Sequence, residues 1–128
     1  MEQAMTTPTE LLALAAKIEA ALMGGRGLDG DIALAIGAVP DGYVKRGSED
    51  LGAFFPEIER GYWRAPKWST SLDAAISAIR PGRRWTLDVG DQGAIVGLSR
   101  DIWSEVHIAQ AKTPPLAVCA ANIKERAG

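Results

Sequence analysis

Basic and aromatic side chains alternate along one segment in the second half of the chain. Between residues 60 and 84, six cations face the single acid Asp73, with tyrosine and tryptophan between them. Arginine forks hydrogen-bond phosphate oxygens in pairs, and aromatic faces stack on bases. The pattern therefore predicts a site for a small anionic ligand, for example a nucleotide. The predicted site residues are Trp63, Arg64, Lys67, Trp68, Arg80, Arg83 and Arg84.

The same segment has a purely structural interpretation. Arg83 and Arg84 follow the expected end of a helix, where the negative end of the helix dipole favours cations without any ligand. Tryptophan side chains bury a large apolar area and often fill cores. Both interpretations remain open from the sequence.

Residues suited to catalysis are few. His107 is the only histidine and no recognised nucleophile motif accompanies it, so we expect a surface histidine on a strand. Cys119 lies on the apolar stripe of an expected helix, which predicts core packing rather than an activated thiol. Glu57 and Glu59 leave metal-free acid–base chemistry open, although a solvated loop explains them as well. We expect a non-enzymatic protein.

Metal and phosphate motifs are incomplete. One histidine and one cysteine cannot form a closed zinc site. Asp29-Gly30-Asp31 lacks the twelve-residue pattern of a calcium loop, and helix capping explains it better. Gly24-Gly25-Arg26-Gly27 has neither the preceding strand nor the following Lys-Ser/Thr of a phosphate loop, so it is read as a linker. No cofactor is expected.

Composition sets the class of the protein. The 128 residues suit one domain, and the net charge of −2 argues against a generic nucleic-acid coat. Residues 1–59 hold ten acids and four bases, whereas residues 60–128 hold six acids and ten bases, so an anion-binding face belongs to the second half. A single cysteine and the lack of a bilayer-length apolar run favour a cytoplasmic protein with no membrane partner.

Start and stop signals predict two helices in the first half. Thr7, Pro8 and Glu10 form a capping box for a helix over residues 7–23, which Gly24-Gly25 ends. Asp29 or Asp31 is expected to cap a short second helix that Gly37 closes. Residues 39–69 are rich in proline, glycine and aromatic residues. They are expected to form an ordered loop, with a short strand around residues 62–64.

The second half predicts a helix, three strands and a closing helix within residues 70–126. Thr70 is expected to cap the first helix. Alternation predicts strands over residues 84–89 and 102–108, and a short apolar run predicts a strand over residues 94–98 between them. Thr113-Pro114-Pro115 begins the closing helix. Short connections imply an antiparallel meander. The fold class is therefore α+β, a single domain in which helices cover a sheet of three antiparallel strands, in the order α-α-(loop)-α-β-β-β-α.

Residues 68–126 resemble a known family. The run Thr70-Ser71-Leu72-Asp73-Ala74-Ala75, the strand around Trp85 and the run from Thr113 to Ala121 (TPPLAVCAA) are similar to small phage and prophage proteins with an "ABA sandwich" domain. The resemblance implies a phage or prophage origin and a helix–sheet–helix fold. It supplies no catalytic residues, because the family is uncharacterised. Small accessory phage proteins often bind host factors, including defence components.

Three functional hypotheses follow. The first is a non-enzymatic phage or prophage accessory protein in the host cytoplasm that binds a small anionic ligand, such as a nucleotide, or acts in counter-defence. The second is an inhibitor or adaptor that binds a host protein through the aromatic loop. The third is a structural protein that self-associates through exposed aromatic residues as a homo-oligomer.

Overall fold

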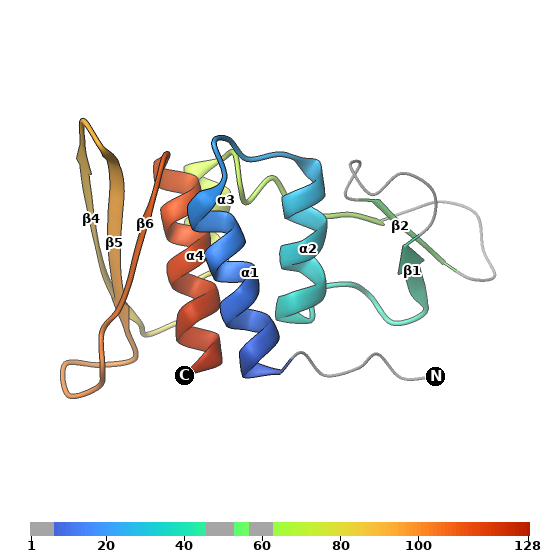
Figure 1. Cartoon of the computed structure of the whole chain (residues 1–128). Coiled ribbons are helices and arrows are strands. Elements are labelled where there is room, and N and C mark those ends of the chain that lie inside the picture. The colour runs from blue at the N-terminus through green and yellow to red at the C-terminus, as the bar shows by residue number, and fades with distance from the viewer. Residues whose placement is uncertain (1–6, 46–52, 57–62) are drawn as a thin grey trace.

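The computed structural model describes residues 7–45, 53–56 and 63–128 and confirms the α+β class. Figure 1 shows a three-stranded antiparallel sheet on one side, a layer of helices against it, and a smaller sheet at the other end. The helices are α1 (Pro8–Ala20), α2 (Arg26–Ile36), α3 (Leu72–Ser77) and α4 (Pro114–Ala127). The strands are β1 (Tyr43–Lys45), β2 (Ala53–Pro56), β3 (Trp63–Arg64), β4 (Arg84–Gly90), β5 (Gly93–Ser99) and β6 (His107–Ala111).

The capping box of α1 is confirmed, because the Thr7 hydroxyl accepts from the Glu10 N–H at 3.1 Å and the Glu10 carboxylate accepts from the Thr7 N–H. The helix ends at Ala20, three residues earlier than expected. The chain then passes against another segment, and a Cβ added at Gly24 would lie 2.0 Å from the Ser69 carbonyl oxygen. Gly24 is therefore a contact point as well as a linker residue.

The expected cap of α2 is wrong. The helix begins at Arg26 behind Gly25, which makes no side-chain cap, and both Asp29 and Asp31 lie inside the helix. Asp29 is fully buried, and its Oδ1 accepts from the Ser69 N–H at 2.8 Å and the Ser69 hydroxyl at 2.7 Å. A partner 40 residues away therefore determines the role of this carboxylate. The end of the helix is as expected, with Gly37 in the left-handed region at φ 71°.

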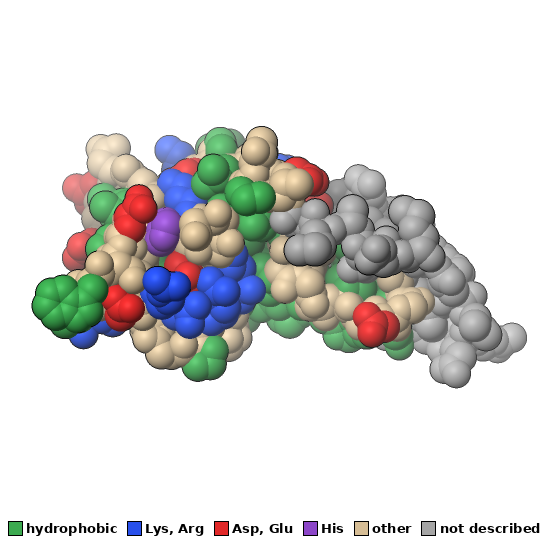
Figure 2. All heavy atoms as spheres, turned by 90° about the horizontal axis from the view of Figure 1, so that it is seen from below, with side chains coloured by type: hydrophobic (Ala, Val, Ile, Leu, Met, Phe, Trp, Pro, Cys, Tyr) green, Lys and Arg blue, Asp and Glu red, His purple; other side chains and the backbone are tan. Residues whose placement is uncertain are grey.

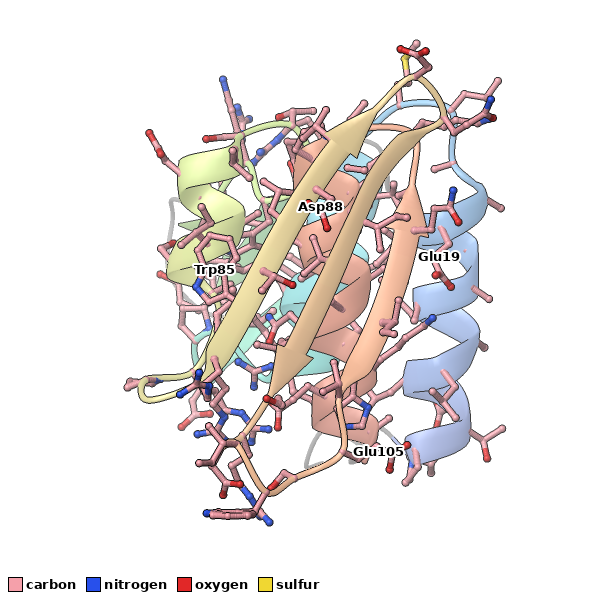
Figure 3. The ribbon with its side chains drawn as sticks, turned by 90° about the vertical axis from the view of Figure 1, so that its left-hand side faces the viewer. Glu19, Trp85, Asp88 and Glu105 are labelled. Carbon is pink, nitrogen blue, oxygen red and sulfur yellow. The ribbon has the colours of Figure 1, made fainter. Side chains whose placement is uncertain are left out.

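The main sheet has the order β4-β5-β6, with both pairs antiparallel. Its central strand β5 alternates, and Ala94, Val96 and Leu98 point into the core against the helices. The opposite face of the sheet carries no helix (Figure 3). Because the described helices lie on one side of the sheet, none of them covers its other face.

Two expected element starts are corrected. Ser71 rather than Thr70 caps α3, because the Ser71 hydroxyl accepts from the Ala74 N–H. The third strand does not cover residues 102–108, since β6 begins only at His107. In place of a strand start, Asp101 accepts from the Trp103 N–H and holds the chain in a turn.

The closing helix α4 lies at the centre of the helical layer. Thr113 caps it as expected, and its side chains contact α1, α3 and the sheet. Cys119 is buried on this helix and its thiol donates to the Trp68 carbonyl at 3.2 Å, confirming the expected core position. None of the described helices has the length and apolarity that a bilayer span requires.

The aromatic loop contains the second sheet, with the order β1-β2-β3 and antiparallel pairing. Phe54 is fully buried and its ring centroid lies 5.8 Å from that of Trp63. The expected short strand is present as β3. Residues 46–52 and 57–62, which include Tyr62, lie outside the described residues.

Candidate arginine–tryptophan site

The predicted site residues do not come together on one surface. Trp63 and Arg64 form β3 in the smaller sheet, at the opposite end of the molecule from β4 (Figure 1). Trp68 is 5% exposed and belongs to the core, and Lys67 lies on the surface beside it. The remaining predicted residues, Arg80, Arg83 and Arg84, lie between α3 and the start of β4.

Arg80 and Arg83 surround the Glu125 carboxylate on the last turns of α4. Arg80 Nη2 contacts both oxygens of Glu125 at 2.7 Å, and Arg83 Nε lies 3.5 Å from Oε1. Burial raises the pKa of Glu125, but the hydrogen bond and charge of Arg80, together with Arg83, outweigh it and lower that pKa below its ordinary value. The carboxylate is therefore ionised at neutral pH and offsets part of the local positive charge.

Arg126 adds a third guanidinium to this group. Its Nε donates to Asn122 Oδ1 at 3.2 Å, and its Nη2 donates to the Ala78 carbonyl at 3.1 Å. Burial and the nearby charges of Arg80 and Arg83 lower the pKa of Arg126, although Glu125 acts in the opposite direction. A cation at the Ala78 carbonyl is favourable because this is the negative end of α3. Three guanidinium groups thus face one carboxylate.

Arg100 lies at the rim of the same region, just after β5. We call Arg80, Arg83, Arg100 and Arg126 the arginine cluster. Figure 2 shows Lys and Arg side chains gathered beside the only histidine on the face from which the end of α4 is seen. Local positive charge therefore concentrates where α3, β5 and α4 end.

Trp103 extends from a rigid turn next to the arginine cluster and is 89% exposed. Asp101 Oδ1 accepts from the Trp103 N–H at 2.8 Å and from the Ser104 hydroxyl at 2.9 Å. The hydrogen bond from the Trp103 backbone, and then that from Ser104, lower the pKa of Asp101 despite slight desolvation, so the turn keeps its acceptor at neutral pH. The indole is thereby presented to solvent on a backbone that local hydrogen bonds have already ordered.

A surface hollow of about 350 Å³ lies beside Trp103, and Arg100 is the member of the arginine cluster that lines it. Its cation and ring suit a phosphate and a flat base, while Ser104, Glu105 and His107 offer polar groups to the edge of a ring. Its lining residues are Arg100, Trp103, Ser104, Glu105, His107, Glu125 and Gly128. The hollow therefore offers one guanidinium and one indole beside the two carboxylates of Glu105 and Glu125.

Sequence reasoning missed Trp103, Arg100 and Arg126. A signal for Trp103 was present, because Asp101 precedes it by two residues, which is the spacing of a turn closed by an aspartate side chain. Alternation with Glu105 and His107 instead suggested a strand. Arg126 had no comparable signal, since only the packing of α4 against α3 brings it to Arg80.

The described residues include neither an activated cysteine nor a cluster of metal ligands. Burial, and secondarily the Asp29 charge, raise the pKa of the Cys119 thiol to about 12, so it is protonated at neutral pH. Within residues 7–45, 53–56 and 63–128, no three His, Cys, Asp or Glu side chains group as metal ligands.

Comparisons with protein-family models, with curated proteins and with solved structures found no match to this chain.

Proposed function

We propose that this protein is a non-enzymatic binding protein whose ligand is a small anion with a flat ring, such as a nucleotide. The ligand occupies the hollow between Trp103 and the arginine cluster. The observation that carries the proposal is the position of Trp103, an indole 89% exposed on a turn fixed by Asp101 beside clustered guanidinium groups. Exposed tryptophan on a rigid support is typical of recognition surfaces.

The charge of the region supports an anionic ligand, because the four guanidinium groups of the arginine cluster outnumber the two carboxylates, Glu105 and Glu125, that line the hollow. Glu125 neutralises one guanidinium, so Arg80, Arg83 and Arg126 keep an excess of positive charge. The exposed Arg100 has no hydrogen bond to another described residue, so its fork is available to a phosphate without breaking a structural contact. Trp103 supports the flat ring of the ligand, because stacking of a base on an aromatic side chain contributes roughly 1–3 kcal/mol per base.

The biological setting belongs to the same proposal. The resemblance of residues 68–126 to small phage and prophage proteins supports a phage-encoded accessory protein, and removal of a host nucleotide signal is one way such a protein acts in counter-defence. The genes on either side of the coding sequence test this origin: phage structural or lysis genes support it, and a conserved metabolic operon contradicts it.

Titration of the Trp fluorescence with nucleoside monophosphates, triphosphates and cyclic dinucleotides tests the binding. We expect saturable quenching by at least one nucleotide, weakened by rising salt because the contact is electrostatic. Trp103→Ala should abolish the quenching, and Arg100→Ala should raise Kd at least about tenfold, the loss of roughly one charge-assisted bond.

Two control variants distinguish a ligand in the Trp103 hollow from one bound at the segment that the sequence predicted. Ile102→Ala removes an exposed apolar side chain adjacent to Trp103 and should leave Kd unchanged. Lys67→Ala removes an exposed cation from the segment that the sequence favoured. If Lys67→Ala weakens binding and Trp103→Ala does not, the ligand occupies that segment and this proposal is wrong.

A further inference from the structure

The two edge strands of the main sheet, β6 and β4, differ in whether their outward-facing backbone groups have hydrogen-bond partners. At the β6 border, Glu19 Oε2 accepts from the Gln110 N–H at 3.0 Å, and Lys124 Nζ donates to the Ile108 carbonyl at 2.8 Å. Glu19 and Lys124 also form an ion pair at 3.0 Å. Two outward-facing backbone groups of β6, the Gln110 N–H and the Ile108 carbonyl, are thus bonded to side chains of α1 and α4, which opposes pairing with a further strand.

The same bonds reveal which groups of β4 point outward. Residues 108 and 110 face away from β5, so residues 107, 109 and 111 bond to β5 opposite residues 98, 96 and 94. The intervening residues of β5 then bond to residues 84, 86, 88 and 90 of β4. The backbone N–H and C=O groups of Trp85, Leu87 and Val89 therefore point away from the sheet.

These outward groups of β4 have no hydrogen-bond partner among the residues that the structure describes. Six of the seven β4 residues are exposed, and Val89 is 66% exposed although it lies on the face that carries the helices. Figure 3 shows β4 at the border of the sheet, with Glu19 beside the opposite border. One border of the sheet is blocked and the other is open for pairing.

We propose that a second copy of this chain pairs antiparallel with β4, with Thr86 opposite Thr86 across a two-fold axis. In this register Arg84 lies opposite Asp88 of the second copy, and Asp88 lies opposite its Arg84. Trp85 lies opposite Leu87. The sequence of β4 is thus complementary to itself in charge and in apolar pairing, which selects a second copy over an unrelated strand.

Backbone parity and charge restrict the register. Residues of β4 whose backbone groups point outward must pair with the same kind of residue in the second copy. The two-fold axis must therefore pass through a residue, such as Thr86 or Leu87, and not between two residues. With Thr86 on the axis, Arg84 and Asp88 face each other in pairs without backbone bonds, where side chains approach most closely. Placing Asp88 on the axis would oppose two like charges. Because the β6 border is blocked, pairing stops at two copies and gives one six-stranded sheet rather than a fibre.

Charge reversal tests the pairing. Sedimentation equilibrium of the wild-type protein should show a monomer–dimer equilibrium. Asp88→Arg and Arg84→Asp should each raise the dimer Kd at least roughly tenfold, because each change occurs twice across the axis and opposes like charges. The double variant Arg84→Asp, Asp88→Arg should restore dimerisation. Asp91→Arg, in the β4–β5 turn, changes the net charge by the same amount as Asp88→Arg and should have no effect on the dimer Kd.

Cross-linking tests the register. Thr86→Cys should form an intermolecular disulfide under mild oxidation, because residues facing each other without backbone bonds have Cα atoms about 4.5 Å apart. Asp88→Cys should not, since it faces Arg84. Circular dichroism and thermal melting establish that each variant folds. A wild-type monomer at every concentration, a dimer indifferent to both single reversals, or a double variant that fails to restore pairing would overturn the proposal.

Discussion

The Asp29 carboxylate connects α2 to the segment before α3, and its removal should destabilise the whole domain. Its Oδ1 accepts from the Ser69 N–H and hydroxyl, and its Oδ2 pairs with Arg26 Nη1 at 2.8 Å. Arg26 also donates to the Ala65 carbonyl. Asp29→Ala therefore leaves a buried amide without an acceptor and a partly buried guanidinium without its counter-charge.

The expected loss of unfolding free energy is about 3–5 kcal/mol, the usual result of removing one partner from a buried ion pair. The unsatisfied Ser69 N–H alone accounts for roughly 1–3 kcal/mol of this. The Lys17–Asp31 pair gives the comparison, because its 2.9 Å separation is almost the same while its side chains are 64% and 29% exposed. Lys17→Ala should cost under about 1 kcal/mol. Burial, and not distance, decides the difference.

Urea unfolding followed by Trp fluorescence measures both variants, with Trp68 as a reporter close to Ser69 in the chain. The midpoint should fall for Asp29→Ala while the slope with urea stays constant, because the same surface is exposed on unfolding. Asp29→Asn, which keeps an acceptor for Ser69 but not the charge, should lie between the two. If Asp29→Ala and Lys17→Ala lose equal stability, the buried network does not hold these segments together and the reasoning fails.

Three further outcomes follow from the same packing. Cys119, whose pKa is about 12, should resist alkylation in the folded protein at pH 8 and react fully in urea; equal rates in both states would contradict its burial. Because the folded pKa of Glu125 is lowered, the stability it contributes is present above its unfolded pKa, near 4.5, and is lost as pH falls through the folded value. Acid titration of unfolding should show this loss, and Glu125→Gln should reduce the pH slope there. Gly24→Ala should destabilise the fold by roughly 1–3 kcal/mol by overpacking against the Ser69 backbone, which thermal melting checks against Gly25→Ala, where an added Cβ meets nothing within 4 Å.

Local signals predicted the parts of the fold that local contacts decide. Thr7 and Thr113 cap helices through amides three residues away, and Gly37 closes α2 through its own left-handed conformation. Such features need only neighbouring residues, so the sequence contains all the relevant partners. The alternation that predicted β4 and the apolar run that predicted β5 are equally local, because each depends only on neighbouring residues.

Long-range partners decided the parts that the sequence mispredicted. An aspartate near a helix start fits both a cap and a buried acceptor, and only Ser69 distinguishes them for Asp29. In the same way, adjacency in sequence suggested that Trp68 belongs with the site, whereas the structure buries it against Cys119. No local signal distinguishes a core tryptophan from an exposed one. The sequence therefore predicted buried Trp68 as a site residue and missed exposed Trp103.

The positive charge of the second half is less available than its total suggests. Lys124 blocks the β6 border, Arg126 holds the end of α3, and Arg80 neutralises a buried carboxylate. These three cations already bond to groups within the protein, so only the donors that those bonds leave over can bind a ligand. The guanidinium groups of Arg84 and Arg100 make no hydrogen bond to another described residue, although the Arg84 backbone pairs with β5. Each guanidinium group is therefore available to an external partner. We propose that Arg84 contacts a second copy of β4 and that Arg100 contacts a phosphate. Arg84→Asp should accordingly change the oligomeric state without changing the nucleotide Kd of the monomer, and Arg100→Ala should do the reverse. If either variant alters both properties, the two surfaces are one site.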